Sequence, residues 1–159
     1  MAMVERERKF LVKNDSWRSQ ARQSVEILQG YFAVAGEGSF RVRIIGDQAN
    51  LNIKGKAQGM SRREFEYPIP VEDARELLAF FCQNRMVAKT RYFVPAAEPG
   101  CQWEIDAYHG PLEGHFTAEL EVPREDFPFV RPPWLGEEKT LDGRFANAAL
   151  AQAGRWPEG

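Results

Sequence analysis

Residues 3–13 read MVERERKFLVK, and Glu5, Glu7 and Lys9 occupy every second position of this stretch. Side chains at alternate positions of a β-strand point to the same face of the sheet. The three charged side chains would therefore share one face, whereas Val4 belongs to the opposite set. The stretch predicts a first strand with one strongly charged face.

The same alternation recurs along the rest of the chain. It predicts seven further strands at residues 25–34, 40–45, 49–56, 61–70, 86–95, 101–108 and 116–122. Apolar residues at helical spacing predict an amphipathic helix over residues 71–82, and residues 144–153 are expected to form a terminal helix. Shorter helical turns are expected around Trp17 and at residues 123–127.

Eight antiparallel strands can close into a barrel, which removes exposed sheet edges. No linker or repeat divides the sequence, so we expect one domain over residues 1–159. The predicted fold class is α+β, mainly β: a closed eight-stranded antiparallel barrel with helices packed outside.

The charged faces of the predicted strands are sorted by sign, since some strands carry only bases and others only acids. The bases are Lys9, Arg41, Arg43, Lys54, Arg62, Lys89 and Arg91. The acids are Glu5, Glu7, Glu64, Glu66, Glu104, Asp106, Glu119 and Glu121.

Two arrangements of these faces are consistent with alternation. For any single strand, a charged face in water above an apolar core is the simpler interpretation. Taken together, the sorted charges and the scarcity of Ser, Thr and Gln at these positions favour a barrel with a charged interior. The helices at residues 71–82 and 144–153 could then cover the apolar outer wall.

Burying so many charges is costly unless they pair or hold charged ligands. Arginine forks bind phosphate oxygens through two parallel hydrogen bonds, and lysine adds a point charge. Carboxylates bind Mg²⁺ or Mn²⁺, which in turn bind phosphate. The set of residues therefore suits a polyanion bridged by hard cations.

Composition excludes several other classes of protein. The 159 residues carry a net charge of −2, which argues against a generic nucleic-acid surface. There is no apolar run of about 18 residues, and five of the first ten residues are charged, so neither a membrane span nor a signal peptide is expected. A cytoplasmic location is predicted. Reduced thiols at Cys82 and Cys101 are favoured over one disulfide.

The motif Glu5-x-Glu7-x-Lys9 resembles the signature of the CYTH superfamily, also called triphosphate tunnel metalloenzymes. The resemblance covers nearly the whole chain in order. It continues through Gln29-Gly30-Tyr31, Arg41-Val42-Arg43, Asn52-Ile53-Lys54-Gly55, residues 62–67, Lys89-Thr90-Arg91-Tyr92, Trp103-Glu104-Ile105-Asp106, Glu119-Leu120-Glu121 and Arg144-Phe145-Ala146-Asn147. One departure is Lys139, where an apolar residue is expected, so no role is assigned to it.

The resemblance implies an antiparallel tunnel that hydrolyses a triphosphate with Mg²⁺ or Mn²⁺. The metal-ligand candidates are Glu5, Glu7, Glu119, Glu121, Glu104 and Asp106. The triphosphate candidates are Lys9, Arg41, Arg43, Lys54, Arg62, Lys89 and Arg91. The catalytic candidates are Lys9, Tyr31, Lys89, Glu64 and Glu66. Tyr31 could lie near Lys9 and activate water as a phenolate, or its hydroxyl could be structural.

Inorganic tripolyphosphate is the favoured substrate, because no nucleoside pocket is evident in the sequence. A class IV-type adenylyl cyclase and a non-catalytic polyphosphate- or nucleotide-binding module remain as alternatives. The expected partner is a small-molecule triphosphate, without nucleic acid or membrane, and a homodimer is left open.

Overall fold

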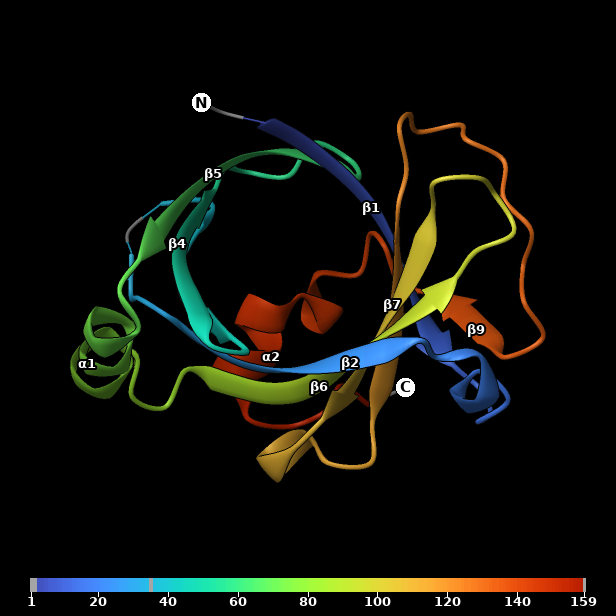
Figure 1. Cartoon of the computed structure of the whole chain (residues 1–159). Helices are drawn as coiled ribbons and strands as arrows, with labels where there is room; N and C mark the ends of the chain where they lie inside the picture. Colours follow the sequence, from blue (N-terminus) through green and yellow to red (C-terminus); the bar gives the residue numbers. More distant parts are fainter. Residues whose placement is uncertain (1–2, 35, 159) are drawn as a thin grey trace.

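The computed structural model describes residues 3–34 and 36–158, and its strands form one antiparallel sheet closed on itself. The strand order is β5-β4-β3-β2-β6-β7-β8-β1-β9, and β5 also pairs with β1. Eight strands therefore make a barrel, and β9 lies outside the closed ring on β1 (Figure 1). The predicted barrel is confirmed.

The strands are β1 (Met3–Val12), β2 (Gln23–Tyr31), β3 (Ser39–Ile45), β4 (Gln48–Lys54), β5 (Ser61–Ile69), β6 (Met86–Pro95), β7 (Gln102–Tyr108), β8 (Phe116–Glu121) and β9 (Leu135–Glu138). The α-helices are α1 (Val71–Phe81) and α2 (Asn147–Ala153). Short 3₁₀ helices span Arg18–Gln20, Gly110–Leu112 and Gly143–Phe145. The eight predicted strands are all present, with ends shifted by up to three residues.

Three local predictions were wrong. Strand β9 was missed because it has four residues, too few to show alternation, and forms only by pairing with β1. Residues 123–127 form a bend and a turn instead of a helical turn. The expected helix at residues 144–153 is split, because Ala146 has an extended backbone (φ −64°, ψ 141°) between a 3₁₀ turn and α2.

The outer wall around β1, β7 and β8 is apolar, as alternation predicts. Phe10, Trp103 and Trp134 are completely or almost completely buried there. The Trp103 and Trp134 rings meet edge-to-face at 5.3 Å between centroids. The chain between β8 and β9 covers this wall and contributes Phe127 and Phe129 to the cluster. This loop, together with Trp17 at the start of a 3₁₀ helix, therefore shields this part of the barrel.

Helix α1 packs on the outside of β2, β3 and β4. Ala74 and Leu78 are its buried residues. The helix lies very close to Gly30 of β2: a Cβ atom at this position would sit 2.6 Å from Cys82 Cβ and 2.7 Å from Leu78 Cδ2. The glycine is needed because no larger residue fits between strand and helix. Cys82 and Cys101 are free thiols, as favoured from the sequence.

Helix α2 lies across one end of the barrel, where it is seen through the ring of strands in Figure 1. Its Leu150 and Ala151 pack in a cluster with Tyr31 and Tyr108. Tyr31 faces the barrel interior, so α2 contacts the interior as well as the wall. The sequence predicts helices packed only outside the barrel, so the position of α2 differs from that prediction. Within the described part of the chain, every helix is too short or too polar to cross a membrane.

Candidate active site

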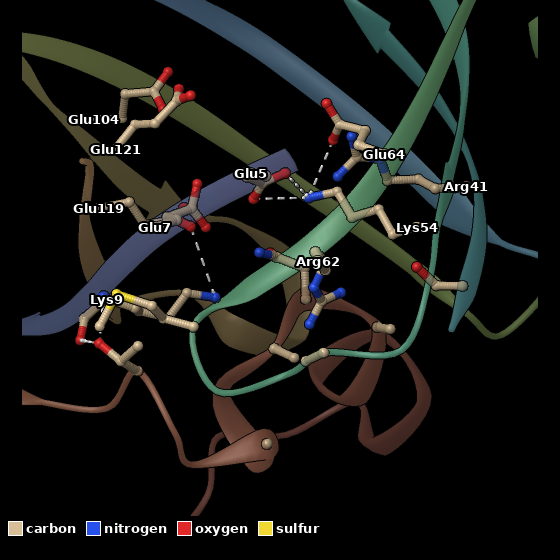
Figure 2. A pocket seen from close by; sticks show the side chains of 18 of the residues that line it. Glu5, Glu7, Lys9, Arg41, Lys54, Arg62, Glu64, Glu104, Glu119 and Glu121 are labelled. Carbon is tan, nitrogen blue, oxygen red and sulfur yellow. Dashed lines mark hydrogen bonds and ion pairs between the residues drawn. The ribbon is translucent and has the colours of Figure 1, made fainter. Parts of the chain in front are cut away.

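The barrel encloses a cavity of about 630 Å³. Thirteen of the fifteen charged residues predicted for the interior line it: Glu5, Glu7, Lys9, Arg41, Arg43, Lys54, Arg62, Glu64, Glu66, Arg91, Glu104, Glu119 and Glu121. Figure 2 shows ten of these side chains converging on the same space. Strand alternation was therefore sufficient to assign these residues to one cavity.

Four carboxylates gather on one side of the cavity because their strands are neighbours (Figure 2). Glu7 of β1 pairs in register with Glu121 of β8, and Glu104 of β7 pairs with Glu119 of β8. Burial, followed by the charge of Glu119, raises the pKa of Glu7 well above its usual value. Burial opposes ionisation of Glu119 too, but Lys9 and hydrogen bonding from Glu7 outweigh it and lower its pKa.

This acidic side has the chemistry of a hard-cation site. Carboxylate oxygens are the ligands that Mg²⁺ and Mn²⁺ prefer, and a bound cation would relieve the repulsion that raises the pKa of Glu7. Within residues 3–34 and 36–158, no three acidic, histidine or cysteine side chains already stand in metal-ligating positions. The donor set fits a divalent cation, and the side chains would have to converge on it.

Arginines crowd together elsewhere in the cavity. Burial, followed by the neighbouring charges of Arg41 and Arg91, lowers the pKa of Arg43 to about 10. Arg41 is 6% exposed, and its buried Nε has no hydrogen-bond partner among the described residues. A bound anion would accept from the unused donor of Arg41 and relieve the repulsion between Arg43 and its two like-charged neighbours.

Lys54 of β4 forms ion pairs with carboxylates of β1 and β5. Its Nζ lies 2.9 Å from Glu5 Oε2 and 3.5 Å from Glu64 Oε2 (Figure 2). Burial alone would raise the pKa of Glu5, but the Lys54 ammonium outweighs it and lowers that pKa. Glu5 is therefore held as an anion, while burial and then the hydrogen bond with Glu5 raise the pKa of Glu64.

Lys89 and Asp106, the other two predicted interior residues, are buried inside the barrel but do not line the cavity. Lys89 Nζ is 2.7 Å from Asp106 Oδ2, and both side chains are fully buried. Asp106 also accepts hydrogen bonds from Arg91 Nε at 2.8 Å and Arg91 Nη2 at 3.0 Å. The pair thereby holds Arg91, which does line the cavity, in a fixed orientation.

Lys9 and Tyr31 both line the cavity near α2. Lys9 Nζ donates to the Phe145 carbonyl at 2.9 Å and lies 4.0 Å from Glu119. The Tyr31 hydroxyl accepts from Gln29 Nε2 at 2.7 Å, and no hydrogen bond joins it to Lys9 among the described residues. The phenolic proton of Tyr31 remains free for another acceptor. This is compatible with a structural role for the hydroxyl as well as with a role in activating water.

Comparison with known proteins agrees with this geometry. The sequence model of the CYTH domain matches residues 3–146. The chain belongs to the CYTH domain family. An inorganic triphosphatase of Acetivibrio thermocellus is 39% identical over 146 residues, which cover 92% of each chain. An inorganic triphosphatase of Nitrosomonas europaea is 36% identical over 152 residues, covering 94% of this chain and 97% of the relative.

Structural comparison finds the same CYTH fold. The crystal structure of the inorganic triphosphatase NE1496 superposes with a TM-score of 0.69 at 33% identity, covering 93% of this chain and 97% of that one. The resemblance deduced from the ordered motifs is thus confirmed over nearly the full length. Lys139, which departs from the expected CYTH pattern, lines the cavity, and its Nζ lies 3.1 Å from the exposed Glu137.

Three polar residues of this CYTH site belong to the ordered motifs, but the sequence analysis assigned them no role. Gln29 is completely buried and carries a chain of hydrogen bonds from Arg43 to Tyr31. Asn52 donates to Glu66 at 3.1 Å. Both alternate with recognised interior residues, so the strand period could have found them. Asn147 lines the cavity from the start of α2, and no periodicity in the sequence places it there.

Proposed function

We propose that this CYTH protein hydrolyses a phosphoanhydride bond of inorganic tripolyphosphate with the help of a divalent cation. One observation carries the proposal: a single cavity joins mutually repelling arginines to mutually repelling carboxylates. A bound anion would relieve the repulsion between the arginines, and bound cations would relieve the repulsion between the carboxylates. A triphosphate chain with bound metal satisfies both at once.

The basic residues bind the phosphates in this proposal. Arg41 and Arg43 supply guanidinium donors, and Arg91 is oriented by Asp106 from behind. Lys9, Lys54 and Arg62 add positive charge from β1, β4 and β5. Lys89 acts through its ion pair with Asp106, since direct contact with phosphate would require it to move into the cavity.

The carboxylates Glu5, Glu7, Glu104, Glu119 and Glu121 would hold the metal, with Asp106 behind them. Membership of the family implies a divalent cation, and we propose that it is Mg²⁺ or Mn²⁺. When bound, the cation neutralises phosphate charge and lowers the pKa of a coordinated water. Glu64 and Glu66 face the same cavity and can orient the attacking water.

Tripolyphosphate is favoured over nucleotides because the described lining residues offer little aromatic surface on which a base could stack. Tyr31 is the one aromatic residue among the described residues that line it. The relatives at 39% and 36% identity are both named inorganic triphosphatases, which supports the same substrate. Pyrophosphate should be a poor substrate, since it would leave several of the basic side chains without a phosphate contact.

A phosphate-release assay tests the proposal. Tripolyphosphate, ATP, thiamine triphosphate and pyrophosphate are compared with Mg²⁺, with Mn²⁺ and with excess EDTA. We expect the highest kcat/KM for tripolyphosphate and no turnover in EDTA. Preference for ATP with cyclic AMP as product would establish the cyclase alternative. Tight binding of every triphosphate without turnover would establish a non-catalytic module.

A further inference from the structure

Asn147 stands between the cavity and the buried Lys89. Its Oδ1 accepts hydrogen bonds from Lys89 Nζ at 3.2 Å and from the Tyr108 hydroxyl at 3.0 Å. Lys89 and Tyr108 are 1% and 2% exposed, whereas Asn147 is partly exposed and lines the cavity. The Asn147 side chain is therefore held by two buried residues on one side and is accessible on the side that lines the cavity.

The orientation of this amide follows from the chemistry of its partner. Lys89 Nζ and the Tyr108 hydroxyl both donate to the amide oxygen, so the oxygen faces the buried side. Burial lowers the pKa of Lys89 to about 7, and below this pH the ammonium has no acceptor for an amide N–H. The amide nitrogen then points away from the buried pair. Among the described residues Nδ2 has no acceptor, and it is not one of the buried polar atoms without a partner. It is thus an unused donor that remains accessible.

The neighbours of Asn147 make an anion the fitting acceptor. Lys9 donates to the carbonyl of Phe145, two residues before Asn147, and both Lys9 and Asn147 line the cavity. A second ammonium at position 147 would be repelled by Lys89, whereas a neutral amide is not. Hydrogen bonding from Lys89 also polarises the amide and strengthens its N–H as a donor.

We propose that Asn147 binds substrate: its Nδ2 donates a hydrogen bond to a phosphate oxygen of the triphosphate at the α2 end of the cavity, and Lys89 and Tyr108 fix the amide in that orientation. The inference rests on the proposed function and adds a phosphate-binding residue from outside the strands. It also gives the fully buried Lys89 a way to act on substrate across one intervening side chain.

The variant Asn147→Asp provides the test. It keeps the side-chain size and an oxygen for Lys89, but replaces the donor by a carboxylate facing the phosphate. We expect the KM for tripolyphosphate to rise about tenfold or more, as for the loss of one hydrogen bond to a charged group. Gln152→Glu is the matched control, because it adds the same charge at an exposed position of the same helix. It should leave KM unchanged.

Binding without turnover gives a second measurement. In EDTA, tripolyphosphate should raise the melting temperature of the wild type and of Gln152→Glu, and raise that of Asn147→Asp much less. Asn147→Leu, which removes both the donor and the Lys89 acceptor, should show the same weak response. Equal responses in all four proteins would overturn the proposal.

The kinetic pattern separates substrate binding from mere support of Lys89. If Asn147→Asp keeps the wild-type KM while Asn147→Leu lowers kcat alone, Asn147 only positions Lys89 and the proposed contact is wrong. If the wild type does not hydrolyse tripolyphosphate, the proposed function fails. The melting-temperature comparison still decides whether Asn147 binds the anion.

Discussion

Lys89 Nζ and Asp106 Oδ2 form a 2.7 Å ion pair with both side chains fully buried, next to the cavity that holds the other charged residues. Asp106 shares its second oxygen with Arg91. One carboxylate therefore pairs with two buried basic side chains, of which Arg91 also has Glu104 and Glu119 as partners. Alternation alone predicts that Lys89 and Asp106 line the cavity. In the structure they do not line it, and Asp106 instead orients Arg91, which does.

Replacing Asp106 by Asn should strongly destabilise the fold. The change leaves Lys89 and Arg91 without their main counter-charge in the interior, which typically costs about 3–5 kcal/mol for a buried pair. Urea denaturation measures the difference in the free energy of unfolding. The exposed Asp126→Asn is the control and should change stability little. A loss below about 1 kcal/mol for Asp106→Asn would contradict the role of the pair.

Glu7 should make the metal-free protein less stable as pH rises. The pKa of Glu7 is raised well above 4.5 in the folded state, so the folded protein holds this proton more tightly than the unfolded chain does. The stabilisation is complete below the unfolded pKa and is lost as pH rises through the folded pKa. Glu7→Gln removes this dependence, so the variant should be more stable than the wild type at neutral pH without metal.

Thermal melting with EDTA and with Mg²⁺ checks this prediction. Metal should stabilise the wild type more than Glu7→Gln, because the variant lacks a carboxylate ligand. Glu113→Gln, at an exposed site, should behave as the wild type. Equal metal responses of Glu7→Gln and the wild type would count against a ligand role for Glu7.

Arg41→Ala should lose activity without losing stability. Arg41 has an unused buried donor and lowers the pKa of Arg43, so its removal relieves repulsion in the empty cavity. The missing contact to a phosphate should cost about 2–4 kcal/mol in transition-state stabilisation, measured from kcat/KM. Arg43→Ala should behave similarly in activity. Wild-type kcat/KM in both variants would mean that these arginines do not contact the substrate.

Arg91→Ala is expected to behave differently from Arg41→Ala. Arg91 is paired with Asp106, Glu104 and Glu119, so its removal leaves three carboxylates short of a counter-charge. Both variants should be less active, but only Arg91→Ala should also melt at a clearly lower temperature. Equal melting temperatures for the two would show that the distinction between paired and unused guanidinium groups is wrong.

Gly30→Ala should destabilise the barrel although it lies outside the active site. The added Cβ would meet Cys82 Cβ at 2.6 Å and Leu78 Cδ2 at 2.7 Å, so α1 would have to move away from β2. Overpacking of this kind costs about 1–3 kcal/mol. Gly143→Ala, where nothing lies within 4 Å, is the matched control for urea denaturation. An unchanged free energy of unfolding for Gly30→Ala would show that α1 is not tightly packed there.

Much of this structure is readable from the sequence because a strand has a period of two. Alternation along β3, β7 and β8 separates the charged residues from the apolar wall before any tertiary contact is known. The sign of the charge on each strand then predicts what the cavity binds. The ordered motifs predict the family, which the match over residues 3–146 confirms.

Other features depend on contacts between segments far apart in sequence. Strand β9 exists only through β1, and Asn147 reaches the cavity because Ala146 breaks the terminal helix and turns α2 across the barrel end. Periodicity also cannot tell how deep a side chain lies along the barrel axis. Strand register and packing decide that depth, and they keep Lys89 and Asp106 from lining the cavity while their neighbour Arg91 faces it. The sequence alone determined which face each strand side chain takes, because that follows from local backbone geometry. Only the tertiary structure decided which of them meet, because distance across the barrel depends on the pairing of all eight strands.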